Sequence, residues 1–100
     1  MLRIYRDCVE MVADVGRVDG LDRDHRRQLQ RAALSVALNV AEGAGVRAGN
    51  RRLRYETALG SAREVLANLE CAEALGASEL QERTRQRLDK IIGTLVRVLY

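Results

Sequence analysis

Apolar residues recur at every third or fourth position in four separate stretches of this 100-residue sequence. That spacing places them on one face of an α-helix, because the helix repeats every 3.6 residues. No proline interrupts any stretch, and a proline inside a helix costs about 3 kcal/mol. Glycines separate the stretches at Gly20, at Gly43 and Gly45, and at Gly76. The sequence therefore predicts an all-α fold of four long helices joined by short turns.

The four predicted helices cover about residues 2–18, 22–44, 50–75 and 78 onward. Their apolar stripes consist of Ile4, Cys8, Met11, Val15 and Val18, of Leu29, Ala33, Val36 and Val40, of Leu59, Ala62, Leu66 and Leu69, and of Leu88, Ile91, Leu95 and Val98. Short turns make neighbouring helices antiparallel, so the predicted architecture is an up-down-up-down four-helix bundle. A chain of this length predicts one domain over residues 1–100.

Candidate capping residues mark the starts of three predicted helices. Asp22 or Asp24 could cap the second helix and Asn50 the third, because these residue types cap helix N-termini. Ser78 and Gln81 have the spacing of a capping box, in which the two side chains bond to each other's backbone. These residues predict where the second, third and fourth helices begin.

The composition also bears on location. No apolar run of about 18 residues is present, so no membrane span is predicted. The first residues are too charged for a signal peptide. Cys8 and Cys71 lie far apart in the sequence, within apolar helical patterns, and therefore predict two buried thiols in a reducing compartment. We expect a cytoplasmic protein.

Polar residues share one side of the second and third predicted helices, beside the apolar stripes. Buried polar groups need hydrogen-bond partners, or each costs about 1–3 kcal/mol. Two such stripes could satisfy each other, within one chain or across a subunit interface, with Arg31 as a partner for Glu42 or Glu64. The alternative is that both stripes face solvent. The predicted network or interface comprises Gln28, Arg31, Ser35, Asn39, Glu42, Ser61, Glu64 and Asn68.

These polar residues also carry a family resemblance. The pattern QxxRAAxSxxxNxAEG over residues 28–43 and the pattern ALGSxxE over residues 58–64 resemble the two motifs of the 23S ribosomal RNA intervening-sequence proteins. That family is similar in fold to the accessory protein of diversity-generating retroelements. One departure is the stretch Gly20-Leu21-Asp22, where the family usually has a proline before the second helix.

The resemblance implies more than the fold. It implies an antiparallel four-helix bundle assembled as a homopentameric ring, without enzymatic activity. It also implies a basic surface suited to nucleic acid, RNA or DNA, or to a reverse-transcriptase partner. No cofactor is expected.

The positive charge is predicted to gather at one end of the bundle. The net charge is only +3, but the topology brings residues 1–9, 36–56 and 90–100 to the same end. These segments carry net charges of +1, +2 and +2, so that end holds +5 and the remainder −2. A polyanion would bind there. The alternative is that this basic surface is simply solvated. Almost all of the positive charge is arginine rather than lysine, and a GC-rich gene would produce the same excess of arginine. The candidate nucleic-acid contacts are Arg3, Arg6, Arg47, Arg51, Arg52, Arg54, Lys90 and Arg97.

The sequence gives little support for a catalytic site. The only histidine, His25, has no glutamate three residues before it, so the Glu-x-x-His pairs of di-iron bundles are absent. Arg31, Glu42, Glu64 and Asn68 could imitate the carboxylate clamp of a helical chorismate-type mutase. We therefore predict a non-enzymatic, self-assembling protein that binds nucleic acid. The alternatives are an oligomeric protein–protein adaptor without nucleic acid and a small mutase.

Overall fold

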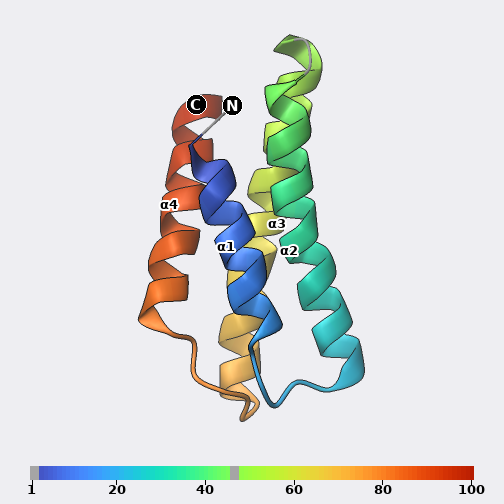
Figure 1. Ribbon diagram of the computed structural model, residues 1–100, viewed down its shortest axis with the longest axis vertical. Coiled ribbons are helices and arrows are strands. Elements are labelled where there is room, and N and C mark those ends of the chain that lie inside the picture. The colour runs from blue at the N-terminus through green and yellow to red at the C-terminus, as the bar shows by residue number, and fades with distance from the viewer. Residues whose placement is uncertain (1–2, 46–47) are drawn as a thin grey trace.

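The computed structural model describes residues 3–45 and 48–100, and all regular secondary structure in this part of the chain is helical. The helices are α1 (Ile4–Gly16), α2 (Arg23–Ala44), α3 (Ala48–Ala74) and α4 (Glu82–Leu99). Each helix packs against two others, in the order α1, α2, α3, α4 and back to α1. Consecutive helices run in opposite directions (Figure 1). The predicted all-α fold of four helices is confirmed.

The apolar stripes meet in one shared core. The largest side chains buried there include Met11, Leu29, Leu88, Ile91 and Leu95. The predicted stripes of α1, α2 and α3 are buried or half-buried throughout. In α4 the last position was wrong, because Val98 is 48% exposed and Leu99 is buried in its place.

The α2–α3 pair is longer than the α1–α4 pair. Helices α2 and α3 have 22 and 27 residues, whereas α1 and α4 have 13 and 18. Figure 1 shows that the end of α2 and the first part of α3 project beyond the beginning of α1 and the end of α4, which lie at the same end of the molecule. The described parts of the three segments predicted to share one end therefore do so.

Helix α2 begins where the sequence predicted. The Asp22 carboxylate accepts a hydrogen bond of 2.8 Å from the backbone N–H of His25, which caps the helix. Helix α3 instead begins at Ala48, so Asn50 lies inside the helix and does not cap it.

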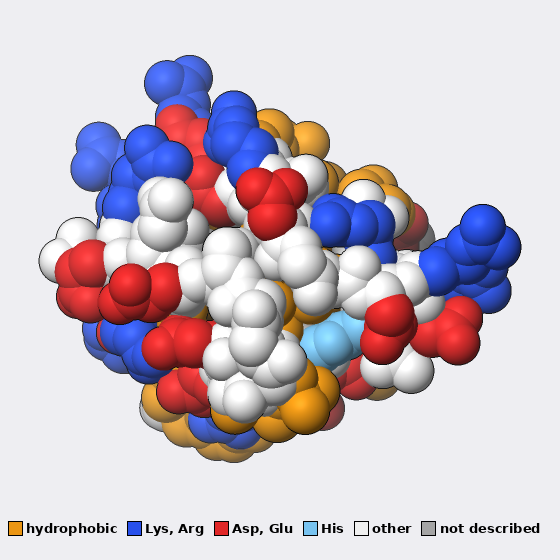
Figure 2. Space-filling model, turned by 90° about the horizontal axis from the view of Figure 1, so that it is seen from below, with side chains coloured by type: hydrophobic (Ala, Val, Ile, Leu, Met, Phe, Trp, Pro, Cys, Tyr) orange, Lys and Arg blue, Asp and Glu red, His pale blue; other side chains and the backbone are white. Residues whose placement is uncertain are grey.

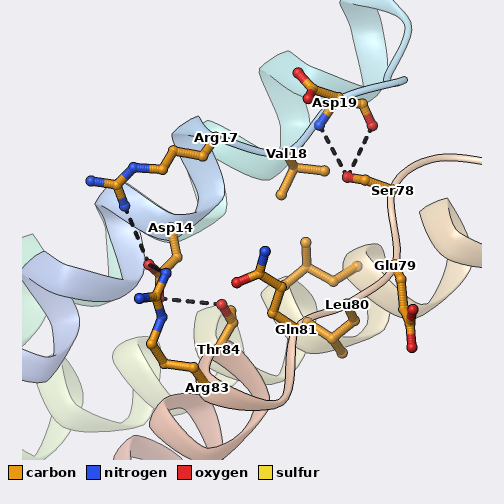
Figure 3. A pocket seen from close by; sticks show the side chains of 11 residues that line it. Asp14, Arg17, Val18, Asp19, Ser78, Glu79, Leu80, Gln81, Arg83 and Thr84 are labelled. Atoms are coloured by element: carbon orange, nitrogen blue, oxygen red, sulfur yellow. Dashed lines mark hydrogen bonds and ion pairs between the residues drawn. The ribbon is translucent and has the colours of Figure 1, made fainter.

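Helix α4 begins at Glu82, four residues later than predicted. The capping box was wrong because Ser78 bonds to a distant loop. The Ser78 hydroxyl accepts from the Asp19 N–H at 3.1 Å and lies 3.3 Å from the Asp19 carbonyl oxygen (Figure 3). Gly20 beside it has a φ of +85°, and a Cβ atom at this position would lie 3.0 Å from the Cα of Ala77. The α1–α2 and α3–α4 loops are thereby joined.

Gly43 leaves room for the Tyr55 ring of α3 to pack against α2. A Cβ atom at this position would lie 2.3 Å from Cε1 of Tyr55, which is too close for any side chain. Tyr55 is buried, with 4% of its surface exposed. The glycine at the end of the first sequence motif is therefore required by the packing of the Tyr55 ring.

Candidate functional site

The first candidate site is the end of the molecule where α1 begins, α2 approaches α3 and α4 ends. We call this the basic end and define it by Arg3, Arg6, Arg51, Arg52, Arg54, Lys90 and Arg97. Arg47, which was also predicted to contribute, lies outside the described residues. The described parts of the three segments carry net charges of +1, +1 and +2, so the basic end holds +4. Figure 2 shows the opposite end, where acidic and basic side chains are intermixed.

Two arginines of α3 reach back to the end of α2. The Nε of Arg51 donates to the carbonyl oxygen of Gly43 at 3.1 Å. Arg54 forms an ion pair of 3.2 Å with Glu42 and a longer hydrogen bond with Asn39. Both arginines are exposed, so they hold the α2–α3 hairpin together and still present charge to solvent.

Arg52 connects α3 to the end of α4. Its guanidinium donates to the carbonyl oxygen of Leu99 at 2.9 Å and pairs with Glu56 at 2.9 Å. The same group lies 5.6 Å from the centre of the Tyr100 ring, within the range of a cation–π contact. Arg52 thus satisfies a backbone carbonyl that a helix C-terminus leaves without an intrahelical partner.

Lys90 is engaged with α1 rather than free. Its ammonium group lies 3.2 Å from the Asp7 carboxylate. One turn earlier on α4, Arg87 pairs with Glu10 at 2.9 Å and contacts Asp14. The acidic residues of α1 therefore pair in antiparallel order with the basic stripe of α4, which here means Arg87 and Lys90. We call these contacts the α1–α4 ion-pair ladder.

Asp14 is the centre of the ladder. It is buried and accepts from the Thr84 hydroxyl at 3.2 Å. Figure 3 shows Asp14 between Arg17 and Arg83, whose guanidiniums lie 3.4 and 3.6 Å from its carboxylate. A cavity of about 150 Å³ opens beside it toward the joined loops. Sequence reasoning missed this cluster, although the spacing of Asp7, Glu10 and Asp14 on one helix turn after another could have indicated it.

Three cations of the basic end have the least internal engagement. Arg3 and Arg6 are exposed and have no hydrogen bond or ion pair to another residue within the described ranges. Arg97 makes one 3.4 Å hydrogen bond, to the Thr94 hydroxyl. These side chains are the ones most available to an anionic ligand.

The second candidate site is the polar seam between α2 and α3. The hydroxyls of Ser35 and Ser61 lie 2.7 Å apart. Asn39 donates to the carbonyl oxygen of Ser35 at 2.8 Å. Asn68 donates to the carbonyl oxygen of Glu64 at 3.2 Å. The two polar stripes do meet, but they are half-buried or exposed rather than part of the core.

The side chains of three predicted network members are without partners among the described residues. Gln28, Arg31 and Glu64 have exposed side chains that make no hydrogen bond or ion pair to the residues that the structure describes. The predicted pairing of Arg31 with Glu42 is wrong within one chain, because Glu42 pairs with Arg54. Arg31 instead lines an open groove with exposed leucines.

Helices α2 and α3 also carry exposed leucines. Leu34 and Leu38 on α2 are 49% and 59% exposed, and Leu53 on α3 is 61% exposed. We call the outward surface of α2 and α3 the hairpin face. Its groove is lined by Arg27, Gln30, Arg31, Leu34, Ser35, Leu38, Asn39, Glu42 and Arg54. Exposed apolar side chains gathered on one surface are typical of a protein–protein contact.

The two cysteines, which could carry thiol chemistry, differ in their burial. Cys8 is fully buried, and burial, with a smaller contribution from Asp7, raises the pKa of its thiol to about 12. Cys71 is exposed, so the prediction of two buried thiols was wrong for it. Its position on α3 faces away from the core. Among the described residues, no three His, Cys, Asp or Glu side chains are grouped to hold a metal ion.

The four residues proposed as a mutase clamp do not converge. Arg31 and Glu64 are exposed, Glu42 pairs with Arg54, and Asn68 bonds to backbone. They lie along the hairpin face. In the described part of the chain, no helix has the length and apolar character that crossing a membrane requires.

The geometry defines an all-helical protein of four antiparallel helices with a polar seam on its longer pair. Residues 2–100 match the family described as 23S rRNA-intervening sequence protein. The match covers nearly the whole chain, so the protein belongs to this family, as the two motifs predicted. None of the curated proteins matches the chain.

Proposed function

We propose that this protein is a non-enzymatic, self-assembling four-helix bundle that binds nucleic acid, RNA in preference to DNA, through its basic end. The observation that carries the proposal is the meeting of three separate segments at that end with a net charge of +4. Positive charge concentrated on one surface attracts polyanions and releases their counterions on binding.

The preference for RNA is supported by the family's name, which refers to a sequence in 23S rRNA. The resemblance to the accessory protein of diversity-generating retroelements adds a candidate enzyme partner, a reverse transcriptase. In both cases the protein would position nucleic acid and perform no chemistry on it.

Assembly would use the hairpin face. Arg31 and Glu64 are opposite charges without partners in the described chain, and Leu34 and Leu38 are exposed on the same face. A second copy can bury these leucines and pair the charges. A buried apolar centre with few unpaired charges is typical of stable subunit interfaces. From the family resemblance we propose a ring of five copies.

Copies with the same orientation would place Arg31 level with Glu64. Within the chain, Ser35 contacts Ser61 and Glu42 contacts Arg54, so the register of the antiparallel pair sets residue 31 at the height of residues 64 and 65. A neighbour related by rotation about the bundle direction has its α3 at the same height. The two charges can therefore meet across subunits although they do not meet within one.

Light scattering coupled to size exclusion tests the assembly. The chain has a mass of 11.2 kDa, and we expect a multiple of it, five-fold for the ring. Arg31→Glu and Glu64→Arg should each lower the mass, and the double exchange should restore it. Arg63→Glu, at an exposed position on another side of α3, is the matched control. An Arg31→Glu protein of unchanged mass would exclude this interface.

Binding is tested by titrating RNA and DNA of the same sequence over a range of salt concentrations. Replacing Arg3 and Arg6 by Gln removes two cations without internal partners from the basic end. For a single strand, each phosphate neutralised by the protein adds about 0.7 to the salt slope. Without these two cations the slope should therefore be smaller by about 1.4. The matched control replaces Arg23 and Arg63 by Gln, two exposed arginines that lie outside the basic end and do not line the groove of the hairpin face.

The results of these titrations distinguish nucleic-acid binding through the basic end from the adaptor function. Equal loss of affinity in the two double variants would contradict a role for the basic end. A stable assembly that binds neither RNA nor DNA would favour the adaptor function, for which the exposed leucines of the hairpin face are the supporting observation.

A further inference from the structure

One aromatic ring is exposed at the basic end. The chain has three tyrosines. Tyr55 is buried and Tyr5 is half-buried, whereas Tyr100 is 80% exposed. Exposing a large aromatic surface to water forgoes the gain of burying it. An exposed ring at the end of the molecule that carries the basic residues is therefore a candidate ligand contact.

Arg52 lies over one face of the Tyr100 ring. The Arg52 guanidinium lies 5.6 Å from the ring centre and is itself held by the carbonyl oxygen of Leu99 and the Glu56 carboxylate. A cation over an aromatic ring covers one of its two faces. Since Tyr100 keeps most of its surface exposed, the other face is open. Arg52 is neutralised by Glu56, so its role here is to support the ring.

Weakly engaged cations belong to the same end of the molecule as this ring. Arg97 is one helical turn before Tyr100 on α4. The ion pair between Lys90 and Asp7 brings the beginning of α1 alongside α4, and with it the exposed side chains of Arg3 and Arg6. An open aromatic face beside several cations is the combination that single-stranded nucleic acids recognise, because bases stack on the ring and phosphates contact the cations.

We propose that Tyr100 stacks on an unpaired base of a single-stranded nucleic acid whose phosphates contact Arg3, Arg6 and Arg97. This inference rests on the proposed nucleic-acid function and specifies its ligand. A duplex would not use the ring, since its bases are already stacked and their faces are covered. A single strand or an unpaired loop offers the base faces that an aromatic side chain can bind.

The test compares affinities for a single-stranded RNA, a duplex of the same length, and an oligonucleotide of abasic sites with the same number of phosphates. Removing a stacking side chain costs about 1–3 kcal/mol per base, which corresponds to roughly 5- to 150-fold in affinity. We expect Tyr100→Leu to weaken single-strand binding by roughly tenfold or more. Tyr100→Phe keeps the ring and should stay within about twofold of the parent.

The controls separate stacking from charge and from folding. Tyr100→Leu should leave affinity for the abasic oligonucleotide and the duplex unchanged, because neither has an accessible base. Val98→Ala, at an exposed neighbouring position, should not alter any of the three affinities. The melting temperature and assembled mass of each variant are measured in parallel, since a merely structural Tyr100 would change those instead.

Specific results would overturn the inference. Single-strand affinity that is unchanged in Tyr100→Leu would exclude stacking, and so would a loss in Tyr100→Phe as large as that in Tyr100→Leu. If the parent protein binds single strands and the Tyr100 variants bind equally well, the inference fails while the proposed function stands. If the parent binds no nucleic acid at all, both fail.

Discussion

The guanidinium of Arg87 on α4 is in direct contact with the carboxylate of Asp14 on α1. Arg87 is 18% exposed and Asp14 only 5%, so water screens this pair less than the pair between Arg87 and Glu10, whose carboxylate is 47% exposed. The basic stripe of α4 is thus engaged in packing α4 against α1. Part of the positive charge of α4 is therefore paired with acidic residues of α1 and is not available to a ligand.

Replacing Asp14 should destabilise the protein. Asp14→Ala leaves the Arg87 guanidinium and the Thr84 hydroxyl without their shared acceptor, and an unsatisfied buried polar group costs about 1–3 kcal/mol. The exposed guanidiniums of Arg17 and Arg83 should add little, since surface ion pairs contribute about 0–1 kcal/mol. Urea unfolding of the variant and the parent measures the difference.

The control for Asp14 is Asp89→Ala. Asp89 is exposed on α4 and makes no ion pair or hydrogen bond within the described ranges, so its replacement should stay within about 0.5 kcal/mol. If both variants unfold at the same urea concentration, the α1–α4 ion-pair ladder does not stabilise the fold.

Gly43→Ala should also destabilise the protein, for a steric reason. The new Cβ would lie 2.3 Å from Cε1 of the buried Tyr55 ring, which forces α2 and α3 apart or moves the ring. Overpacking of this kind costs about 1–3 kcal/mol. Gly16→Ala is the matched control, because nothing lies within 4 Å of a Cβ there, and it should be neutral or slightly stabilising. A Gly43→Ala protein as stable as Gly16→Ala would contradict the predicted clash.

The core could be predicted from the sequence because it depends on local periodicity. The stripes of Leu29, Val36 and Val40 on α2 are buried as their spacing indicates. The start of α4 could not be predicted in the same way. Ser78 has the local signal of a cap, but it bonds to Asp19, 59 residues away in sequence. A contact over that separation depends on where two loops meet, which no local pattern encodes.

The candidate site likewise has one part that the sequence could predict and another that it could not. Topology alone brought Arg6 and Arg97 to one end, because alternating helix directions fix which segments share it. The internal partners of Arg51 and Arg52 include backbone carbonyls of Gly43 and Leu99. Those bonds depend on how far the α2–α3 pair projects beyond α4, and helix lengths were predicted only to within a few residues. The weakly engaged cations could therefore be separated from the engaged ones only in the structure.

The N-cap of α2 provides a further test of the helix starts. Asp22→Ala removes the acceptor of the His25 N–H, and losing an N-cap costs about 0.5–2 kcal/mol. Asp24→Ala, which removes a nearby exposed carboxylate inside the helix, is the charge-matched control. Thermal unfolding followed by circular dichroism should show a clearly lower midpoint for Asp22→Ala than for Asp24→Ala. Equal midpoints would show that the cap contributes nothing measurable.

The two thiols should differ in reactivity. Cys71 is exposed and Cys8 is completely buried, and the thiolate is the form that reacts. A disulfide reagent at pH 8 should label one thiol per folded chain, and two after unfolding. Cys71→Ser should abolish labelling of the folded protein. Rapid labelling of a second thiol under native conditions would contradict the burial of Cys8.

Stability in alkali should depend on the same buried thiol. Burial raises the pKa of Cys8 from 9.0 to about 12. Below pH 9 the thiol is protonated in both states, so its contribution to the free energy of unfolding is constant. Between pH 9 and 12 the unfolded chain releases this proton while the folded chain keeps it, and the contribution falls by about 1.4 kcal/mol per pH unit.

The Cys8→Ala variant lacks this loss, whereas every other titrating group is common to both proteins. The stability advantage of the parent over Cys8→Ala, measured by urea unfolding, should therefore be constant from pH 7 to 8.5 and shrink at pH 10 and above. A difference that stays constant through pH 10.5 would mean that Cys8 ionises equally in both states.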